Sequence, residues 1–514
     1  MSDMLPGAPA FADGPHTVGR WLTDRAASSP DHIAIDDRGV RIGYADLELR
    51  ARELSLGLRR GGYGPGDRVA TISGNSIDHV VAFFACALAG IAFVPLSWRL
   101  SARELSEVVD RSAPALVLVE DEYAGSADDA FRRLAQRPLV AALGTTGIEA
   151  DVPPRAGGPG ERRGVRDGDP LLIIYTSGSE AAPKGVVLTH ANCFWNNLAL
   201  AGARQLTSDD IVLAMLPQFH VAAWNCQPLL AWWVGATVVL ERSFQPRRIL
   251  HLLADRGVTA MMGVPTQYRL LADDPGFAAV SLSKLRVALV GGATMPDDLA
   301  ARWAAAGRPL TQGYGLTEAA PNVLCEGKPY PHVDVCIVDQ ATQLPLEGAA
   351  SGELWVRGPS VFAGYLGDPQ ATSRALVETS DGVWLRTGDI VHRDAEGGIR
   401  IVDRMKDIYI SGGENVAPAE VERALCLHPG IAEAAVVGVP DAVWGERGVA
   451  FVVAASGARL SEDEVLAHAR AELAGFKVPA RVAFVAELPR STIEKLARSR
   501  LHVRAIDLVK GNRS

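Results

Sequence analysis

The hydrophobic pattern predicts helices and short strands in alternation from Gly43 onward. Residues 44–60 carry leucines at helical spacing, and the apolar run "RVATIS" follows them as a strand. Further short apolar runs, each bounded by turn residues or helices, are "PALVLVE", "PLLIIYT", "IVLAML", "TVVLE", "VTAMMGV" and "RVALVGG". Short apolar strands between helices are typical of largely parallel sheets with covered faces. The sequence therefore predicts an α/β fold.

One apolar run, residues 80–96, reaches the lower length limit of a membrane-spanning helix. It contains Gly90 and has Pro95 next to its last residue. We therefore expect a buried helix up to about Ala89, a glycine turn and a buried strand. No membrane span is predicted.

The pattern changes twice further along the chain. Residues 151–169 are rich in Pro, Gly and Arg, which predicts an exposed connection between two subdomains. From about Val335, short strands and glycine turns indicate a small β-rich subdomain. After a boundary near residues 403–407 the pattern is that of a compact α+β domain, with helices in 417–428 and 461–473.

Length and composition narrow the classes of protein. A chain of 514 residues is too long for one core, so two or three domains are expected. The net charge of −9 argues against a nucleic-acid-binding protein. The six cysteines show no CxxC spacing, which favours reduced thiols in a cytoplasmic protein over a metal site or disulfides. The N-terminus has no basic region followed by an apolar one, so no signal peptide is expected.

Several common motifs are absent from the sequence. It contains no GxxxxGK[ST], no GxGxxG, no GxSxG and no HExxH. The P-loop NTPase, Rossmann dehydrogenase, α/β-hydrolase and zincin classes therefore have no motif support.

The stretch "YTSGSEAAPKG" is a candidate phosphate loop. The hydroxyls of Thr176, Ser177 and Ser179 can donate to phosphate oxygens, Gly178 allows close backbone approach, and Lys184 supplies a positive charge. The alternative is a plain turn after a strand.

Two other stretches carry candidate chemistry. In "QGYGLTEAAP" the ring of Tyr314 can stack on a base, Thr317 can bind a phosphate and Glu318 can bind Mg²⁺; alternatively, Thr317 caps a helix. Asp389 in "LRTGDI" can accept both ribose hydroxyls, with Arg404 beside it, or the two form a surface turn and ion pair. The stretches "ISGGENVAPAEVE" and "PRSTIEKLAR" alone indicate only a capped helix and a solvated lysine.

Together, in this order and spacing, these stretches resemble the adenylate-forming superfamily of acyl- and aryl-CoA ligases, luciferases and nonribosomal adenylation domains. The landmarks are "YTSGSEAAPKGVVLTH", "YGLTE", "GELWVRG", "GYLGDPQAT", "WLRTGD", "DRMKDIYISGGENVAPAEVE" and "PDAVWGE". The segment "PQFHVAAWN" is similar to the acid-pocket segment of stand-alone fatty-acid and aromatic-acid CoA ligases. The resemblance covers nearly the whole chain.

The resemblance implies an N-terminal domain of two parallel-type α/β subdomains plus a β-rich one at 1–403, a hinge at 404–408 and a small mobile α+β domain at 409–514. It implies two half-reactions: a carboxylate and MgATP give acyl-AMP and pyrophosphate, and then CoA gives acyl-CoA and AMP. The cofactors are ATP and Mg²⁺, with CoA as co-substrate.

The resemblance also implies roles for individual residues. The β- and γ-phosphates would be held by Thr176, Ser177, Gly178, Ser179 and Lys184. The adenosine moiety and α-phosphate would be held by Gly291, Gly292, Ala293, Tyr314, Gly315, Thr317, Asp389 and Arg404. The catalytic set would be Lys495, Glu318 (the metal ligand), His220 and Thr317. The hinge would be at Lys406, and the CoA tunnel would be lined by Gly412, Gly413 and His220.

The acid pocket is expected to be lined by His220, Ala222, Ala223, Trp224, Asn225, Gly263, Gly313, Gly315, Pro321 and Asn322. No Lys or Arg lies in the segments that carry these residues, which are 220–227, 263–266, 291–293 and 313–322. A dicarboxylate would need such a cation in the pocket. The expected substrate is therefore a monocarboxylic acid, medium-chain aliphatic or aromatic.

The sequence departs from the family pattern at Glu180, Ala181 and Glu494. A unit charge about 5 Å from a phosphate costs roughly 3 kcal/mol at an effective dielectric constant near 20. Glu180 therefore points to solvent, binds a magnesium ion or a lysine, or weakens ATP use. Glu494 precedes the catalytic lysine, where most relatives carry glycine.

Two alternative functions stay open at this stage. One is an adenylating enzyme of specialised metabolism that passes its acid, or a small oxyanion such as nitrite, to a carrier-protein thiol or an amine. The other is a degenerate member that binds nucleotide and turns over poorly. Neither involves nucleic acid.

Overall fold

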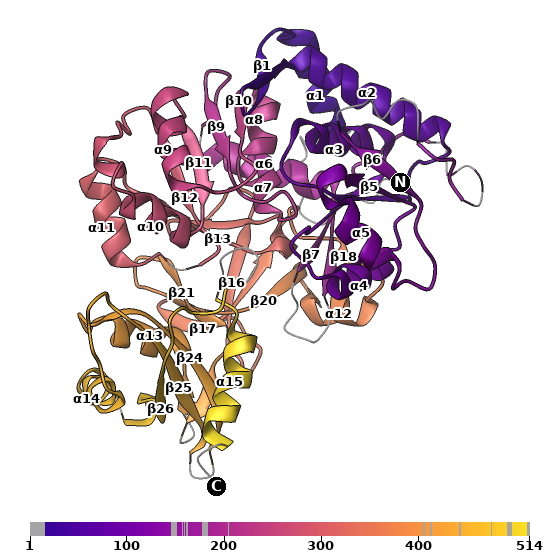
Figure 1. The fold of residues 1–514 in the computed structure, drawn as a ribbon. Helices are drawn as coiled ribbons and strands as arrows, with labels where there is room; N and C mark the ends of the chain where they lie inside the picture. The colour runs from indigo at the N-terminus through magenta and orange to yellow at the C-terminus, as the bar shows by residue number, and fades with distance from the viewer. Residues whose placement is uncertain are drawn as a thin grey trace. The chain divides into compact units, whose positions relative to one another are not determined.

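The chain forms two compact units in the computed structural model (Figure 1), Met1–Val335 with Val356–Arg386, and Cys336–Trp355 with Thr387–Ser514. The residues described are 16–144, 152–156, 158, 160, 163–176, 183–203, 205–293, 295–404, 407–411, 414–441, 444–473, 475–490 and 496–510.

The first unit contains a nine-stranded sheet. Across the sheet its strands are β15 (Lys328–Pro329), β14 (Asn322–Cys325), β13 (Thr311–Gly315), β12 (Val287–Val290), β11 (Ala260–Gly263), β9 (Ile211–Ala214), β10 (Thr237–Leu240), β1 (Ile33–Asp37) and β2 (Val40–Gly43). The six strands from β13 to β1 pair in parallel, and the others add antiparallel edges. Helices α9 (Pro246–Asp255), α10 (Pro265–Asp273) and α11 (Asp297–Ala305) contribute Ile249, Tyr268 and Trp303 to the core of this sheet.

A seven-stranded sheet in the same unit has a similar design. Across the sheet its strands are β18 (Gly364–Tyr365), β8 (Lys184–Thr189), β7 (Pro170–Thr176), β4 (Ala92–Leu96), β3 (Arg68–Ile72), β5 (Leu116–Glu120) and β6 (Val140–Leu143). The strands from β7 to β6 are parallel, and β8 and β18 are antiparallel. Helices α4 (Ala102–Ser112) and α5 (Ala124–Phe131) pack on it through Leu105 and Phe131. The predicted parallel sheets are confirmed.

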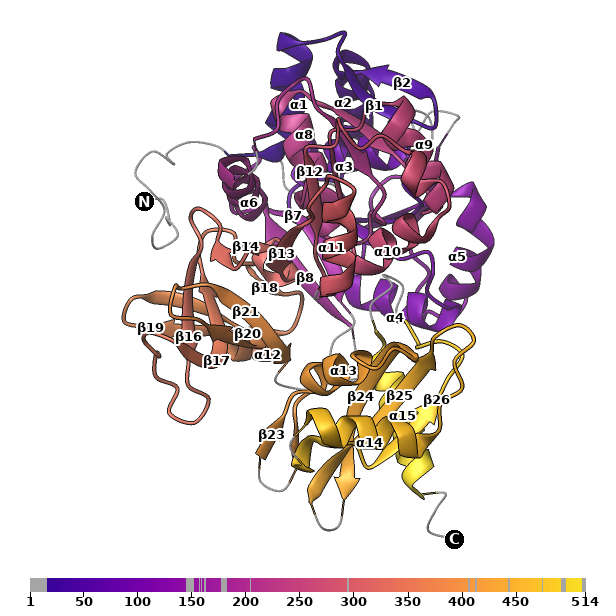
Figure 2. The ribbon, with the colours of Figure 1, turned by 90° about the vertical axis from the view of Figure 1, so that its left-hand side faces the viewer.

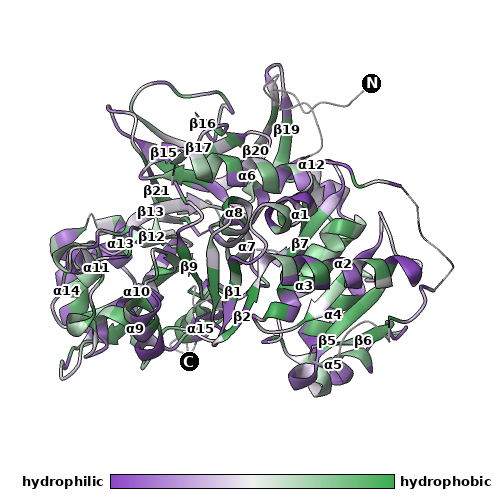
Figure 3. Cartoon of the chain, turned by 90° about the horizontal axis from the view of Figure 1, so that it is seen from above, coloured by the Kyte–Doolittle hydropathy of each residue, from purple (hydrophilic) through white to green (hydrophobic). Residues whose placement is uncertain are grey.

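The remaining helices of this unit are α1 (Val18–Ser28), α2 (Tyr44–Arg60), α3 (Ile77–Ala89), α6 (His190–Ala203), α7 (Ala222–Asn225), α8 (Pro228–Val234) and α12 (Pro369–Ala375). Helix α3 is nearly all apolar and buried, whereas Figure 3 shows both hydropathy colours along α2.

The predicted helix, glycine turn and strand of residues 80–96 are confirmed. Helix α3 ends at Gly90, whose φ of 76° lies in the left-handed region that glycine adopts without a Cβ penalty. The buried strand β4 begins at Ala92. In the described part of the chain, no helix is long and apolar enough to cross a membrane.

The prediction for residues 151–169 was wrong. These residues connect β6 to β7, and both strands belong to the seven-stranded sheet. They therefore do not link two subdomains. A high content of Pro and Gly indicates irregular backbone, but it does not show which elements the segment joins.

The predicted β-rich region is a five-stranded sheet. Its strands are β16 (Asp334–Val338), β17 (Ala350–Arg357), β20 (Gly382–Arg393) and β19 (Leu376–Thr379) in that order, with β21 (Ile399–Arg404) also paired to β20.

The C-terminal part of the second unit is the predicted α+β domain (Figure 2). Its strands are β22 (Tyr409–Ser411), β23 (Glu414–Val416), β24 (Ile431–Asp441), β25 (Gly445–Ala454) and β26 (Arg481–Phe484), and its helices are α13 (Pro418–Cys426), α14 (Glu462–Glu472) and α15 (Arg498–Lys510). Successive residues of β24 face two different cores. Val436 packs with Val421 of α13, whereas Val437 packs with Leu501 of α15.

Candidate active site

Four of the predicted site segments meet at one edge of the nine-stranded sheet. Strands β9, β11, β12 and β13 run parallel, so their carboxyl ends lie at the same edge. The segments that end or follow them contain His220, Gly263, Gly291 and Thr317. The N–H of Gly291 donates to the carbonyl oxygen of Gly263 at 3.2 Å. The carboxyl edge of a parallel sheet is the usual ligand-binding edge of such folds.

The predicted adenine segment, Gly291 to Ala293, is held by Gln312. The side-chain amide of Gln312 donates to the carbonyl oxygens of Gly313, at 2.9 Å, and Ala293, at 3.5 Å. Its Oε1 accepts from the N–H of Met295 at 3.1 Å. One side chain thus joins the loop after β12 to strand β13. Gln312 opens the quoted stretch "QGYGLTEAAP" but was not predicted to belong to the site.

Gly315 lies where two backbone segments approach closely. A Cβ atom at this position would lie 1.6 Å from the carbonyl oxygen of Pro321. No residue with a side chain fits there unless the backbone moves. Gly315 and Pro321, both predicted pocket residues, are therefore in direct contact.

Thr317 and Glu318 lie in a short 3₁₀ helix, η4 (Thr317–Ala319). Its N-cap is Leu316, so the alternative in which Thr317 caps a helix is not realised. The backbone oxygen of Glu318 accepts from the N–H of Phe362 at 2.8 Å. Its side-chain Oε1 accepts from the hydroxyl of Tyr365 at 2.8 Å.

The two ends of the candidate phosphate loop are held in the seven-stranded sheet. Thr176, the last residue of β7, pairs with Lys184, the first residue of β8. The ammonium nitrogen of Lys184 lies 5.3 Å from the centroid of the Tyr365 ring. Ser177, Gly178, Ser179, Glu180 and Ala181 lie outside the described residues.

A pocket of about 240 Å³ lies beside this strand pair. Arg111, Tyr175, Lys184, Tyr365 and Asp368 line it, among other residues. Burial raises the pKa of Tyr175 to about 12, so its hydroxyl is neutral near pH 7. The pocket therefore has charges of both signs on a partly aromatic wall.

The Glu318 side chain fits the role of a ligand for a magnesium ion that arrives with a phosphate-bearing substrate. In the described ranges, no group of three or more His, Cys, Asp and Glu side chains could hold a metal ion. Mg²⁺ is commonly bound by one or two protein carboxylates together with substrate phosphates. The neutral hydroxyl on Oε1 fixes the Glu318 carboxylate without neutralising its charge.

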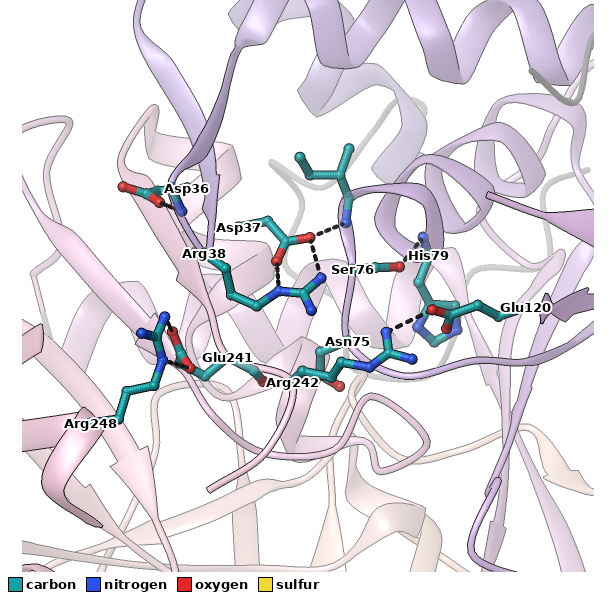
Figure 4. A network of polar contacts seen from close by, with 12 residues as sticks. Asp36, Asp37, Arg38, Asn75, Ser76, His79, Glu120, Glu241, Arg242 and Arg248 are labelled. Carbon is teal, nitrogen blue, oxygen red and sulfur yellow. Dashed lines mark hydrogen bonds and ion pairs between the residues drawn. The ribbon is translucent and has the colours of Figure 1, made fainter. Parts of the chain in front are cut away.

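The segment that leads to His220 is held by Asn75, which precedes α3. The side chain of Asn75 donates to the carbonyl oxygens of Leu216 and Glu241 at 2.9 and 3.0 Å. Its Oδ1 accepts from the N–H of Gln218 at 3.0 Å. Figure 4 shows Asn75 near the ion pairs Arg242–Glu120 and Arg248–Glu241, each 2.7 Å long.

A buried histidine supports the same segment. His79 contacts the hydroxyl of Thr71 at 2.9 Å through Nε2 and the side-chain oxygen of Gln218 at 3.0 Å through Nδ1. Burial lowers the pKa of His79 to about 4, so its ring is neutral near pH 7. Since Oε1 of Gln218 can only accept, Nδ1 carries the proton and Nε2 accepts from Thr71. His220 itself is half-buried, and its backbone N–H donates to Pro217.

The predicted pocket residues of α7 differ in exposure. Ala222 is half-buried and Ala223 is buried. Trp224 is fully buried, its ring stacks on Phe83 at 4.5 Å, and its indole N–H donates to the carbonyl oxygen of Gln218 at 2.6 Å. Trp224 therefore fixes α7 against α3, whatever else it contacts.

Asn225 and Asn322 belong to a buried network of amides. The side-chain amide of Asn196 donates to the carbonyl oxygen of Asn225 at 2.8 Å. That of Asn322 donates to the same oxygen at 3.2 Å. The network joins α6, α7 and the start of β14, and it brings two predicted pocket residues together.

Asp389 and Arg404, the predicted ribose residues, lie opposite each other in the second unit. They pair in the antiparallel register of β20 and β21. Asp389 is buried, and its N–H donates to Thr387 Oγ1 at 3.0 Å. Outside the described part of the chain lie the side chain of Arg404 and the residues Lys406, Gly412, Gly413, Glu494 and Lys495.

Comparison with known proteins decides the family. Residues 22–366 match the family "AMP-binding enzyme", and residues 420–495 match "AMP-binding enzyme C-terminal domain". The chain belongs to the AMP-binding enzyme family. The predicted resemblance and the predicted α/β fold are confirmed.

This AMP-binding enzyme has relatives that match it over nearly its whole length. A feruloyl-CoA synthase of Amycolatopsis sp is 38% identical, over 95% of this chain and 99% of the relative. The indoleacetate–CoA ligase of Aromatoleum aromaticum is 34% identical, over 93% and 96%. The crystal structure of ATP-bound MatB from Rhodopseudomonas palustris is similar with a TM-score of 0.87 at 30% identity, over 96% and 100%.

These findings establish the reaction class. This AMP-binding enzyme is an AMP-forming acid–CoA ligase that uses a carboxylic acid, ATP and CoA. The predicted function is confirmed at this level, and neither alternative function has better support.

Proposed function

We propose that this enzyme activates an aromatic or otherwise ring-bearing monocarboxylic acid. The observation that carries the proposal is the absence of Lys and Arg from residues 220–227, 263–266, 291–293 and 313–322. A second carboxylate in the pocket would need such a cation. The names of the feruloyl-CoA and indoleacetate–CoA relatives favour the aromatic class over medium-chain aliphatic acids.

In the first half-reaction, a carboxylate oxygen attacks the α-phosphorus of ATP, and the bond to pyrophosphate breaks. All reactants are anionic, so catalysis is mainly charge neutralisation and positioning. In our proposal Thr176, Ser177, Gly178, Ser179 and Lys184 hold the β- and γ-phosphates. Thr317 contacts the α-phosphate, and Lys495 bridges it and the attacking carboxylate.

Glu318 is the proposed ligand of Mg²⁺. The ion, when bound with ATP, neutralises charge on the phosphate oxygens. The hydrogen bond from Tyr365 to Glu318 supports this role, because it leaves the second carboxylate oxygen for the ion.

The proposed nucleoside site has two parts. Gly291, Gly292, Ala293, Tyr314 and Gly315 line the adenine slot, which the support from Gln312 favours. Asp389 and Arg404 hold the ribose, which their pairing in β20 and β21 favours.

In the second half-reaction, the sulfur of CoA attacks the acyl carbon, AMP leaves with the C–O bond electrons, and the thiol proton passes to solvent. Gly412, Gly413 and His220 are the proposed tunnel residues.

We place the domain boundary at a hinge of residues 404–408, with Lys406 at its centre, between domains 1–403 and 409–514. A cytoplasmic location is proposed because the six cysteines are scattered without CxxC spacing, which favours reduced thiols.

The substrate class is tested by mass spectrometry of the CoA thioesters formed from ferulate, indoleacetate, octanoate and malonate. We expect kcat/KM for ferulate or indoleacetate to exceed that for octanoate at least about tenfold, a difference of about 1.4 kcal/mol in transition-state binding, with no malonyl thioester. A higher kcat/KM for octanoate or malonate would refute the proposed acid class and leave the CoA-ligase reaction intact.

A further inference from the structure

Tyr365 touches two oppositely charged groups of the site at once. Its hydroxyl donates to Oε1 of Glu318 at 2.8 Å. Its ring lies 5.3 Å from the ammonium nitrogen of Lys184. These two residues are the proposed metal ligand and the proposed phosphate-loop cation. They are 134 positions apart in the sequence, and one side chain lies against both.

The position of Tyr365 is set by contacts independent of either charge. Strand β18 pairs with β8, where Tyr365 faces Val186. The N–H of Tyr365 donates to Oγ1 of Thr372 at 2.9 Å. The hydroxyl of Thr372 in turn donates to the carbonyl oxygen of Asp368 at 2.8 Å.

The neighbours of Tyr365 add further restraint. The N–H of Leu366 donates to the carbonyl oxygen of Gly185, next to Lys184, at 2.8 Å. The ring of Phe362 meets the Tyr365 ring edge to face at 4.9 Å. The N–H of Phe362 donates to the backbone oxygen of Glu318 at 2.8 Å. The segment 362–366 therefore holds Glu318 by its backbone and its side chain, and it holds β8 at the foot of the phosphate loop.

The two contacts use different parts of the tyrosine. A hydroxyl that donates to a carboxylate keeps the carboxylate charged and fixes its rotamer. An aromatic face attracts a cation without competing for its N–H donors. The Tyr365 ring therefore occupies no N–H group of Lys184, and the Tyr365 hydroxyl occupies only Oε1 of Glu318.

We propose that Tyr365 is a positioning residue for MgATP, whose hydroxyl sets Glu318 for the metal and whose ring sets Lys184 for the phosphates. The inference rests on the proposed roles of Glu318 and Lys184. It adds Tyr365 as a residue that positions both Glu318 and Lys184.

Calorimetric titration of the full chain with ATP is done once with excess Mg²⁺ and once with EDTA. The two titrations test the hydroxyl contact with Glu318 and the ring contact with Lys184 separately. Tyr365→Phe keeps the ring and removes the hydroxyl. We expect it to raise the Kd of ATP with Mg²⁺ about tenfold and to change the Kd in EDTA less than about twofold. Tyr365→Leu also removes the ring, so the Kd should rise in both conditions.

The double variant Tyr365→Phe with Glu318→Gln checks that the hydroxyl acts through Glu318. Once the carboxylate is gone, loss of the hydroxyl should change the Kd less than about twofold further. Tyr63→Phe is the matched control, and it should behave as wild type. It removes a hydroxyl outside the site, which donates to the carbonyl oxygen of Pro153 at 2.9 Å.

Three results would overturn the proposal. They are an unchanged Kd in Tyr365→Phe with Mg²⁺, an equal rise with Mg²⁺ and EDTA, and an undiminished effect of Tyr365→Phe in the Glu318→Gln background. In folded Tyr365→Leu, an unchanged Kd of ATP in EDTA would refute the role of the ring at Lys184. If Tyr365→Leu fails to fold, Tyr365→Phe still decides the role of the hydroxyl at Glu318. If wild type binds ATP equally with and without Mg²⁺, the metal role of Glu318 fails, and this outcome is distinct from a failure of Tyr365.

Discussion

The side-chain oxygen of Asn196 accepts two hydrogen bonds from Asn322, one from the backbone N–H at 3.1 Å and one from the side-chain amide at 3.0 Å. The amide nitrogen of Asn196 donates to the carbonyl oxygen of Asn225 at 2.8 Å. All three residues are buried. Helix α6 thereby fixes two proposed walls of the acid pocket relative to each other.

Asn196→Ala should lower the free energy of unfolding by about 2 to 3 kcal/mol, because it leaves the buried N–H of Asn322 without an acceptor. It should also raise KM for the acid more than KM for ATP. Urea unfolding and steady-state kinetics measure both effects. A double-mutant cycle with Asn322→Ala should show coupling of about 1 kcal/mol or more.

The control is Gln343→Ala, which removes an exposed amide bonded only to a nearby carbonyl oxygen, that of Gln340. It should change stability by less than about 0.5 kcal/mol. Additive effects of the Asn196 and Asn322 variants would show that the pair does not act as a unit.

Gly315→Ala should abolish most adenylation. The added Cβ would lie 1.6 Å from the carbonyl oxygen of Pro321, so the backbone that carries Thr317 and Glu318 must move. A shift of this size should lower the rate of ATP–pyrophosphate exchange about 100-fold or more.

Gly125→Ala is the matched control for Gly315→Ala. It lies in α5, where an added Cβ meets no atom within 4 Å. We expect full exchange activity and equal or higher stability, since alanine favours a helix over glycine by up to about 1 kcal/mol. Normal exchange in Gly315→Ala would refute the close approach to Pro321.

Stability should fall as the pH drops below 6.5. Burial lowers the pKa of both His79 and His190 to about 4, whereas unfolded histidines titrate near 6.5. Between these values the unfolded chain binds more protons, so the free energy of unfolding rises with pH and its histidine contribution is complete above 6.5. Urea unfolding should show a slope of up to about 3 kcal/mol per pH unit near pH 5.

His79→Gln should remove about half of that slope, and His251→Gln, which alters an exposed histidine, should leave it unchanged. A free energy of unfolding that is flat from pH 6.5 to 5 would contradict the burial of neutral histidines.

Lys495→Ala should separate the two half-reactions. We expect loss of ATP–pyrophosphate exchange by about 100-fold or more, with thioester formation from supplied acyl-AMP and CoA retained within about threefold. Equal loss in both assays would remove the proposed role of Lys495 in adenylation alone.

The sequence was sufficient for local structure and insufficient for side-chain partners. The apolar run that ends at Ala89, with Gly90 after it, predicted α3 and β4 because burial and glycine geometry are local properties. Tyr365 and Asn196 were missed as supports of the site, because their partners Glu318 and Asn322 are 47 and 126 positions away. The order and spacing of the quoted stretches predict which residues share a site, but only the folded sheet shows what holds them.

Formation of an acyl-AMP is the central step of the proposed reaction, and one isotope measurement tests it directly. The enzyme is given acid labelled with ¹⁸O in its carboxylate, ATP and CoA, and the nucleotide product is weighed by mass spectrometry. We predict AMP that carries one ¹⁸O atom. The thiol displaces AMP from the acyl carbon, and the former carboxylate oxygen stays on the α-phosphorus of the AMP that leaves. Unlabelled AMP, or ADP with the label in inorganic phosphate, would contradict the account.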